Sequence, residues 1–366
     1  MKKLRTGFTT GSAATAATKA ALRFLFTGER PRLCDIPLPA GGRLDVPVAG
    51  VEAADALGRV RAVVVKDGGD DPDVTHGARI SCLVGLDPQG AREGVFIDGG
   101  AGVGRATLPG LPVAVGMAAI NPGPLRQIRR AVLEETRLAG YAGAVRVLVE
   151  VEHGEALAQK TMNPRLGILG GVSILGESGI VVPYSLESWK ASIGEGLDVA
   201  RAMGLEAVIL TTGRRSERFH MARYPVFAPQ AYVQAADFFA FSLREAAERG
   251  FGEIIWSCFF GKLVKMAMAM EYTHAKSGEI DFARLAAWAG EAGVPSKTAA
   301  RIAGANTARH VLEIIRNEPG QGAFVARVRR EALGAARGFA GPGPRLGLRV
   351  FDFDGGLMSE AYDPVD

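Results

Sequence analysis

Four carboxylates and a histidine are crowded into one short segment of this sequence. The segment reads VKDGGDDPDVTHG (residues 65–77) and follows a valine-rich stretch that predicts a strand. Its titratable groups are Asp67, Asp70, Asp71, Asp73 and His76. Carboxylates this close repel one another, so grouping them lowers stability unless cations or hydrogen-bond donors face them. The segment predicts either a functional loop, in which one of these groups is a general base, or a solvated turn with a structural histidine.

Hydroxyl groups gather at the start of the first predicted helix. The segment RTGFTTGS contains Thr9, Thr10 and Ser12, and it leads into a helix expected over residues 12–26 with Ser12 as its N-cap. Free backbone N–H groups at a helix N-terminus bind anions such as carboxylates. The same residues also suit an ordinary helix cap with a tight turn, and both interpretations stay open.

A glycine-rich loop, GGAGVGRATLPG, covers residues 99–110 and carries Arg105. Glycine lets a backbone approach a flat ligand closely. The segment AINPGP follows, with Pro124 placed where it can open the next helix. Ordinary loop chemistry explains both segments as well as ligand binding does.

Loops of the second half follow predicted buried strands directly. They read TTGRRSE (residues 211–217) and FFGKLVK (residues 259–265), and a further glycine-rich turn covers residues 167–176. In open α/β sheets, ligands bind beyond the carboxyl ends of the strands. The candidate binding residues are Gly170, Gly171, Thr211, Thr212, Gly213, Arg214, Arg215 and Lys262. For the two arginines, the alternative is a solvated face.

The elements that position these loops predict two domains of different class. In residues 1–155, strands are expected over residues 59–66, 79–86, 94–98 and 144–151, with helices over 12–26 and 125–139. This mixture predicts an α+β domain. In residues 156–366, the expected strands 207–211 and 253–258 alternate with helices over 186–203, 237–249 and 262–270. Such alternation predicts an α/β domain with a largely parallel sheet, followed by helices over 282–338 and a last strand over 346–353.

Composition excludes several classes of protein. The 366 residues are 48% hydrophobic, enough for two cores, and the net charge of +4 is spread along the chain. Without a basic block no nucleic-acid partner is expected, whereas an acidic small molecule suits a mild positive excess. Three widely spaced cysteines, Cys34, Cys82 and Cys258, predict buried free thiols and a reducing, cytoplasmic location. No apolar run is long enough to predict a membrane span.

Several well-known motifs are absent. No G-x-G-x-x-G or H-E-x-x-H occurs, and the partial P-loop at Gly261-Lys262 fails at Trp256 and Leu263. A calcium loop that began at Asp67 would need glutamate where Ala78 stands. Dehydrogenase, nucleotidase and metalloprotease interpretations are thereby weakened, and no protein-bound metal is expected.

Taken in order, these loops resemble the CbiD family of methyltransferases from anaerobic cobalamin biosynthesis. The matching segments are RTGFTTGSAA, VVKDGGDDPDVTHGA, GGAGVGRATLPGL, AINPGP, NPRLGILGGVSILGESGIVVPYS, TTGRRSE and FFGKLVKMA, and together they span nearly the whole chain. Two positions depart from the family pattern: Ala13 stands where cysteine is frequent, and Met268, Ala269 and Met270 stand where glycine usually follows. Neither departure affects a group assigned to chemistry.

The resemblance implies methylation of C-1 of cobalt-precorrin-5B by S-adenosylmethionine, which gives cobalt-precorrin-6A. It also implies a Rossmann-like second domain. We expect the methyl donor at the strand ends of that domain, at Gly170, Gly171, Thr211, Thr212, Gly213 and Asp237. The corrin ring would face the first domain, near Thr9, Thr10, Ser12, Lys66 and Arg105, while Arg214, Arg215 and Lys262 could serve either ligand. In the acidic segment, a carboxylate or His76 would remove a ring proton, or the carboxylates would contact the donor.

Two other classes of protein remain as alternatives. A nicotinamide-dependent reductase of the same pathway fits a Rossmann-like half, although G-x-G-x-x-G is missing. A non-catalytic tetrapyrrole carrier would bind the corrin and have no affinity for the donor. The sequence is compatible with a homo-oligomer.

Overall fold

The computed structural model describes residues 4–87 and 94–363 and divides into two compact units, Met1–Ser185 and Leu186–Asp366. An N-terminal mixed sheet and a largely parallel C-terminal sheet confirm the expected fold class at that level. The boundary lies later than the expected one at residue 155. The reason is that β11 (Ile168–Leu169), β12 (Gly171–Val172) and β13 (Ile180–Val181) pair with strands of the first unit.

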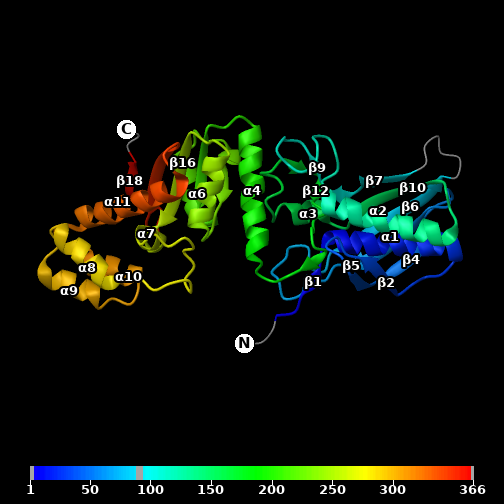
Figure 1. Cartoon of the computed structure of the whole chain (residues 1–366), viewed down its shortest axis with the longest axis horizontal. Coiled ribbons are helices and arrows are strands. Elements are labelled where there is room, and N and C mark those ends of the chain that lie inside the picture. Colours follow the sequence, from blue (N-terminus) through cyan, green and yellow to red (C-terminus); the bar gives the residue numbers. More distant parts are fainter. Residues whose placement is uncertain (1–3, 88–93, 364–366) are drawn as a thin grey trace. The chain divides into compact units, whose positions relative to one another are not determined.

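The first unit is built on a five-stranded sheet in the order β4-β5-β6-β10-β7. Its strands are β4 (Gly50–Ala53), β5 (Val60–Val65), β6 (Arg79–Asp87), β10 (Ala144–Val151) and β7 (Val95–Gly99). Only the β10–β7 pair is parallel. In β5 the alternate residues Val60, Ala62 and Val64 are buried, because successive side chains of a strand point to opposite faces. Helix α1 (Thr10–Thr27) packs against β5 and β6 (Figure 1).

Helix α1 owes its close packing to alanine. Ala13, Ala16, Ala17 and Ala20 are fully buried and leave room for α2 (Pro122–Ala139). The N-cap of α1 is Thr9, whose hydroxyl accepts the Ser12 N–H at 3.2 Å, so Ser12 is not the cap that its residue type predicted.

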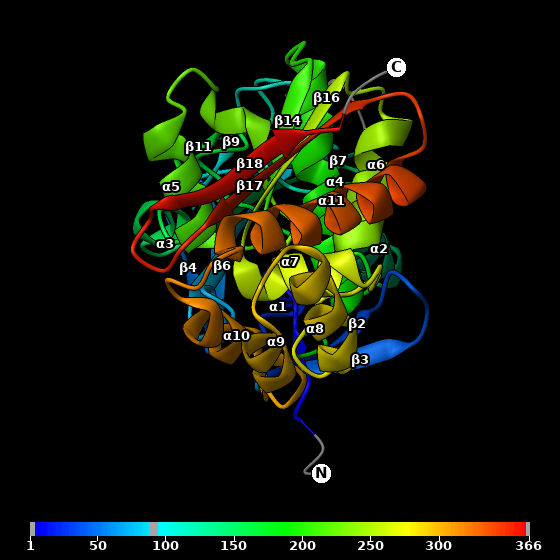
Figure 2. The ribbon, with the colours of Figure 1, turned by 90° about the vertical axis from the view of Figure 1, so that its left-hand side faces the viewer.

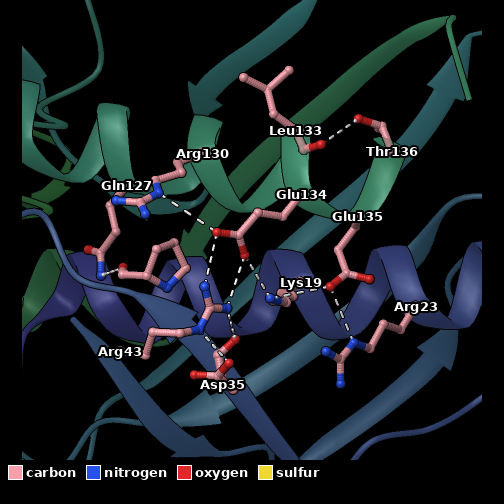
Figure 3. Close-up of polar contacts among 11 residues, drawn as sticks. Lys19, Arg23, Asp35, Arg43, Gln127, Arg130, Leu133, Glu134, Glu135 and Thr136 are labelled. Atoms are coloured by element: carbon pink, nitrogen blue, oxygen red, sulfur yellow. Dashed lines mark hydrogen bonds and ion pairs between the residues drawn. The ribbon is translucent and has the colours of Figure 1, made fainter. Parts of the chain in front are cut away.

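A cluster of charges ties α1 to α2 (Figure 3). The Lys19 ammonium is buried and lies 3.0 Å from a Glu134 oxygen and 3.3 Å from a Glu135 oxygen. Arg43 donates to the Glu134 carboxylate at 3.0 Å, and Arg23 donates to the Glu135 carboxylate at 3.3 Å. Arg43 is the first residue of β3 (Arg43–Pro47), which pairs with β2 (Leu33–Pro37). Each carboxylate therefore faces at least two cations, which offsets the cost of burial.

Short elements complete the first unit. They are β1 (Gly7–Phe8), β8 (Gly102–Val103), β9 (Arg105–Ala106) and α3 (Gly154–Ala158). The short strands pair as β1 with β13, β9 with β11, and β8 with β12.

The second unit contains a five-stranded sheet in the order β15-β14-β16-β17-β18, parallel except for β18 (Figure 2). Its strands are β14 (Ala207–Thr211), β15 (Tyr232–Gln234), β16 (Glu253–Phe259), β17 (Arg345–Phe351) and β18 (Leu357–Tyr362). Its helices are α4 (Leu186–Ala202), α5 (Arg214–Arg223), η1 (Pro229–Ala231), α6 (Phe239–Glu248), α7 (Phe260–Ala267), α8 (Phe282–Glu291), α9 (Ser296–Ala303), α10 (Ala308–Ile315) and α11 (Gln321–Ala340).

Helices cover both faces of the second sheet. In β14, Val208 and Leu210 pack in a core with Phe239 of α6, whereas Ile209 packs with Met221 of α5. This alternation explains why β14 reads as a continuous apolar run, as expected for a parallel strand buried on both sides.

Candidate functional site

In the acidic segment, two carboxylates are engaged by Arg5. The Arg5 guanidinium bonds both oxygens of Asp67, with Nη2 3.0 Å from Oδ1. The Arg5 N–H donates to the Asp70 carboxylate at 2.7 Å, and the Asp70 N–H donates to the Arg5 carbonyl at 2.9 Å. The Arg5 hydrogen bonds hold the pKa of the Asp67 carboxyl below its usual value. The repulsion predicted for this segment is thus met by an arginine from the N-terminal segment.

The other two carboxylates also have donors within the first unit. Asp73 pairs with the buried Lys66 ammonium and accepts the Thr75 N–H at 2.7 Å and the Thr75 hydroxyl at 2.6 Å. Burial alone would raise the pKa of Asp73, but Lys66 and Thr75 outweigh it and hold the pKa below its usual value. Asp71 accepts the Tyr184 N–H at 2.8 Å. Lys66, expected near a substrate, is therefore inside the fold and bound to Asp73.

His76 is an exposed group of the segment. Its Nδ1 accepts the Gly68 N–H at 3.0 Å, so in the neutral ring the proton is on Nε2. Its side chain is 52% exposed. The backbone around it is closely packed, because a Cβ at Gly69 would lie 2.2 Å from the Arg5 carbonyl oxygen. The segment is a compact assembly with the N-terminal residues, and both His76 and Asp70 are exposed on it.

The hydroxyl groups at the start of α1 serve internal hydrogen bonds. Thr10 Oγ1 accepts the Leu175 N–H at 2.7 Å, and Ser12 Oγ donates to the Gly179 carbonyl at 2.8 Å. Thr9, Thr10 and Ser12 are all buried. These bonds attach the segment over residues 175–179 to the helix N-terminus, so the structure shows the helix cap and turn that the residues also suited.

The glycines of the 99–104 loop approach the chain itself. A Cβ on Gly102 would lie 1.9 Å from the Val151 carbonyl oxygen, and one on Gly104 would lie 2.4 Å from the Ile168 side chain. These glycines are therefore required by packing within the first unit, which is the ordinary loop chemistry that the sequence also allowed. Arg105 donates to the Asp98 carboxylate at 2.9 Å and to the Gly99 carbonyl at 3.1 Å, and its side chain stays about half exposed.

Gly170 and Gly171 lie in the first unit, not in the second domain where we expected them. Gly171 is packed against Gly102, because a Cβ built on Gly171 would lie 2.2 Å from the Gly102 backbone. Gly170 has a φ of 83°, and nothing lies within 4 Å of a Cβ built on it. Gly170 lines a pocket of about 250 Å³ with Glu155, Ala158, Gln159, Pro164, Ile168, Leu169 and Gly171. The two glycines thus belong to the first unit, whereas Thr211 and Gly213 belong to the second.

The carboxyl edge of the second sheet brings the later loops together. The chain leaves β14 for β15 on one side and returns to β16 on the other, so the strand order reverses between β14 and β16. Such a reversal opens a crevice at the carboxyl ends, which is where open α/β sheets bind ligands. The Thr212 N–H donates to the Ser257 carbonyl at 3.2 Å across this point.

The residues after β14 differ in accessibility. Thr211 is fully buried and its hydroxyl donates to Glu217 at 3.3 Å, while the Thr212 hydroxyl lies 3.1 Å from the Ser216 hydroxyl. Gly213 precedes α5 with a φ of 150°, no side chain caps the helix there, and nothing lies within 4 Å of a Cβ built on it. Gly213 therefore leaves the backbone of this turn open to a ligand.

Asp237 and Lys262 form a pair at the same edge. The Lys262 ammonium contacts the Asp237 carboxylate and donates to the Thr273 carbonyl at 3.0 Å. The Thr273 N–H donates to the Asp237 carbonyl at 2.8 Å. The pair joins the end of β15 to α7, so each charge of the pair already has an opposite charge beside it.

An aromatic group at the ends of β16 and β17 was not predicted from the sequence. The rings of Phe259 and Phe353 stack with centroids 5.2 Å apart and planes 11° apart, and Phe219 meets Phe259 edge-on at 6.2 Å. The Arg215 guanidinium lies 5.5 to 5.8 Å from all three centroids and donates to the Phe353 carbonyl. The available signal was a phenylalanine just after the predicted strand 253–258 and another at the end of the predicted strand 346–353.

The cysteines do not supply a nucleophile. Cys34, Cys82 and Cys258 are free and buried, which confirms the expectation of buried thiols. Burial raises the pKa of Cys34 to about 11 and that of Cys82 to about 12.

Within residues 4–87 and 94–363, no three or more His, Cys, Asp or Glu side chains are grouped so that they could hold a metal ion. None of the helices in that part of the chain is both long and apolar enough to span a membrane.

The class of protein follows from comparison with known families. Residues 1–183 match the CbiD family and residues 272–362 match the CbiD C-terminal domain, so the chain belongs to the CbiD family. The cobalt-precorrin-5B C(1)-methyltransferase of Nitratidesulfovibrio vulgaris is 50% identical, over 98% of this chain and 93% of that protein. The protein of the same name from Geobacillus kaustophilus is 42% identical, over 98% of this chain and 95% of that protein.

A solved structure also matches. The crystal structure of the cobalamin biosynthesis protein CbiD from Archaeoglobus fulgidus is 30% identical, over 72% of this chain and 79% of that chain, with a TM-score of 0.39.

Proposed function

We propose that this chain transfers a methyl group from S-adenosylmethionine to C-1 of cobalt-precorrin-5B and so forms cobalt-precorrin-6A in anaerobic cobalamin biosynthesis. The observation that carries the proposal is the 50% identity, over 98% of the chain, with a protein named for that reaction. The second unit supports it with an open, largely parallel sheet whose strand order reverses at a loop with exposed backbone. We interpret this unit as Rossmann-like.

Methyl transfer requires that the two reactants be aligned and does not require a nucleophile from the protein. The donor supplies a methyl group on a positively charged sulfur. In the transfer the carbon–sulfur bond breaks, its electron pair stays on sulfur, and an electron pair of the ring forms the new carbon–carbon bond. Holding two reactants in line supplies roughly 7 to 11 kcal/mol of barrier reduction. Such a reaction is compatible with cysteines that are buried.

For the donor, we propose the crevice between β14 and β16. Gly213 offers unobstructed backbone there, Thr212 offers a partly exposed hydroxyl, and the Asp237 carboxylate lies beyond the adjacent strand. Thr211 would act indirectly, because its buried hydroxyl holds Glu217 and the turn. Gly170 and Gly171 no longer support this location, since they lie in the first unit.

For the acceptor and for proton removal, the accessible groups of the original set are the natural candidates. Arg105, Arg214 and Arg215 are exposed cations suited to carboxylates, whereas Thr9, Thr10, Ser12 and Lys66 are buried. In the acidic segment, His76 has an exposed ring, and Asp70 is held by backbone contacts with Arg5.

One substitution separates two roles for the acidic segment. Asp70→Asn should lower turnover if Asp70 removes a ring proton, and should raise the donor dissociation constant if Asp70 contacts the donor. Turnover by mass spectrometry and donor affinity by calorimetry, each against wild type, measure the two effects. Full turnover with unchanged affinity would end both ideas.

The proposed reaction has a direct test. Cobalt-precorrin-5B incubated anaerobically with the chain and donor should gain the mass of one methyl group, and NMR with a ¹³C-labelled methyl should place it on C-1. Side-by-side titration with S-adenosylhomocysteine and NADPH separates the rival classes. Affinity for NADPH alone would favour a reductase, and corrin binding without donor affinity would favour a carrier. Cytoplasmic location and a homo-oligomeric state stay predictions.

A further inference from the structure

We propose that an aromatic shelf at the carboxyl ends of β16 and β17 binds one face of the tetrapyrrole acceptor. The shelf consists of Phe259, Phe353, Arg215 and Arg309. This inference rests on the proposed function and extends it, because it assigns the acceptor to the second unit, whereas the sequence led us to expect it near the first.

The shelf has an exposed aromatic surface. Phe353 is 47% exposed although it stacks on Phe259, so part of its ring faces solvent. It lies in the loop that joins β17 to β18, which Figure 2 shows on the same side of the unit as α5 and α10. The loop is closely built: a Cβ on Gly355 would lie 2.9 Å from the Phe219 ring, and the Asp352 carboxylate accepts the Asp354 and Gly356 N–H groups at 2.9 and 2.7 Å. The ring is therefore presented by a defined loop.

Two guanidinium groups flank this ring. Arg215 lies 5.5 Å and Arg309 6.0 Å from the Phe353 centroid. Arg215 is exposed and makes no ion pair with a carboxylate in the described part of the chain. Within residues 4–87 and 94–363, Arg309 pairs only with Glu313 on its own helix, at 3.1 Å, and its side chain is 75% exposed. Exposed pairs of this kind are weak, so the Arg309 charge is available to a ligand.

Charge decides between the two ligands. S-adenosylmethionine is cationic at sulfur, and two neighbouring guanidinium groups disfavour a cation. A precorrin has a broad conjugated ring with carboxylates around its rim, so its face can stack on Phe353 while rim carboxylates bond the arginines. The shelf also adjoins the proposed donor crevice, because Phe259 ends β16 and Arg215 is two residues after Gly213. A donor at the crevice and an acceptor on the shelf would lie next to each other along one sheet edge.

The test uses the full chain with stable corrin probes. Affinity for cobyrinic acid, its heptamethyl ester and S-adenosylhomocysteine is measured by calorimetry. Phe353→Leu and Arg309→Gln should each lower the affinity for cobyrinic acid about tenfold, which corresponds to the loss of one stacking or charge-assisted contact. Neither substitution should change the affinity for S-adenosylhomocysteine. Arg284→Gln is the matched control, since Arg284 lies 4.9 Å over the ring of Trp288, which is buried. This control variant should bind all three probes as wild type does.

The uncharged ester checks the inference without any substitution. Wild type should bind the ester more weakly than the acid, and Arg309→Gln should not change ester affinity. The shelf assignment would be overturned if both shelf variants bound cobyrinic acid as tightly as wild type does. It would also be overturned if they bound S-adenosylhomocysteine more weakly and cobyrinic acid with unchanged affinity. Methylation of cobalt-precorrin-5B by wild type separates the two proposals: if wild type methylates and the shelf variants match it in KM, only the shelf fails.

Discussion

The Lys66–Asp73 pair offers a sharp test of how the acidic segment is held. The Lys66 side chain is 1% exposed and that of Asp73 is 23% exposed, and Lys66 is the cation paired with Asp73. Lys66→Met nearly keeps the length of the buried side chain and removes its charge. The Asp73 carboxylate is then left largely buried without its cation, while its hydrogen bonds from Thr75 remain.

The expected cost follows from this geometry. Removing one partner of a fully buried pair costs about 3 to 5 kcal/mol. Asp73 keeps partial exposure and two hydrogen bonds, so we expect the loss of stability of the first unit to be at or below the low end of that range, about 2 to 3 kcal/mol. The double variant Lys66→Met/Asp73→Asn has no buried charge and keeps an oxygen for Thr75. It should recover all but about 1 kcal/mol.

The pH dependence of the stability of the first unit tests the same pair independently. In wild type the pKa of Asp73 is depressed, so the pair stabilises the fold above the carboxyl's unfolded pKa of about 3.9, and this contribution is lost as pH falls through the folded pKa. In Lys66→Met, burial raises the pKa of Asp73 and protonation relieves the buried charge. The difference between variant and wild type should therefore shrink from pH 7 to pH 4.

Native-state hydrogen exchange by mass spectrometry, read on peptides of β5 and β6, measures this loss. Trp189, Trp256 and Trp288 all lie in the second unit, so tryptophan fluorescence during urea unfolding is an internal control that should not shift. A loss below about 1 kcal/mol, or the same loss in the double variant, would refute the reasoning.

Two further predictions concern buried ionisable groups. Lys19→Met should destabilise the first unit by about 3 kcal/mol in the same exchange assay, because Glu135, 6% exposed, loses Lys19 and is left with Arg23; a loss under about 1 kcal/mol would contradict this. Burial, with Arg349 adding to it, lowers the pKa of His220 to about 4. The folded state thus favours the neutral ring, so the second unit should lose stability as pH falls from about 6.5 toward 4, and NMR should show His220 neutral at pH 5.

The second unit was the more predictable half. Its strands β14 and β16 are buried on both faces and separated by helices, so each reads as a short apolar run beside helical periodicity. The domain boundary was missed because β11, β12 and β13 have two residues each and show no periodicity. Their place in the first unit depends on pairing with distant strands, which a local pattern does not contain.

The candidate site was predictable in outline only. Gly102 does need to be glycine, but the sequence does not show that the approaching atom is the Val151 carbonyl and not a ligand. Likewise, four aspartates signal a need for cations without naming Arg5 and Lys66 as their source. The shelf was missed because Arg215, Arg309 and Phe353 come from three separate elements and form no motif along the chain.

Hydrogen exchange of the full chain with and without S-adenosylhomocysteine tests most directly whether the methyl donor binds at the carboxyl edge of the second sheet. We predict slower exchange in peptides over residues 211–217 and 259–265, and unchanged exchange over residues 167–176. Protection confined to peptides within residues 4–185 would contradict the account.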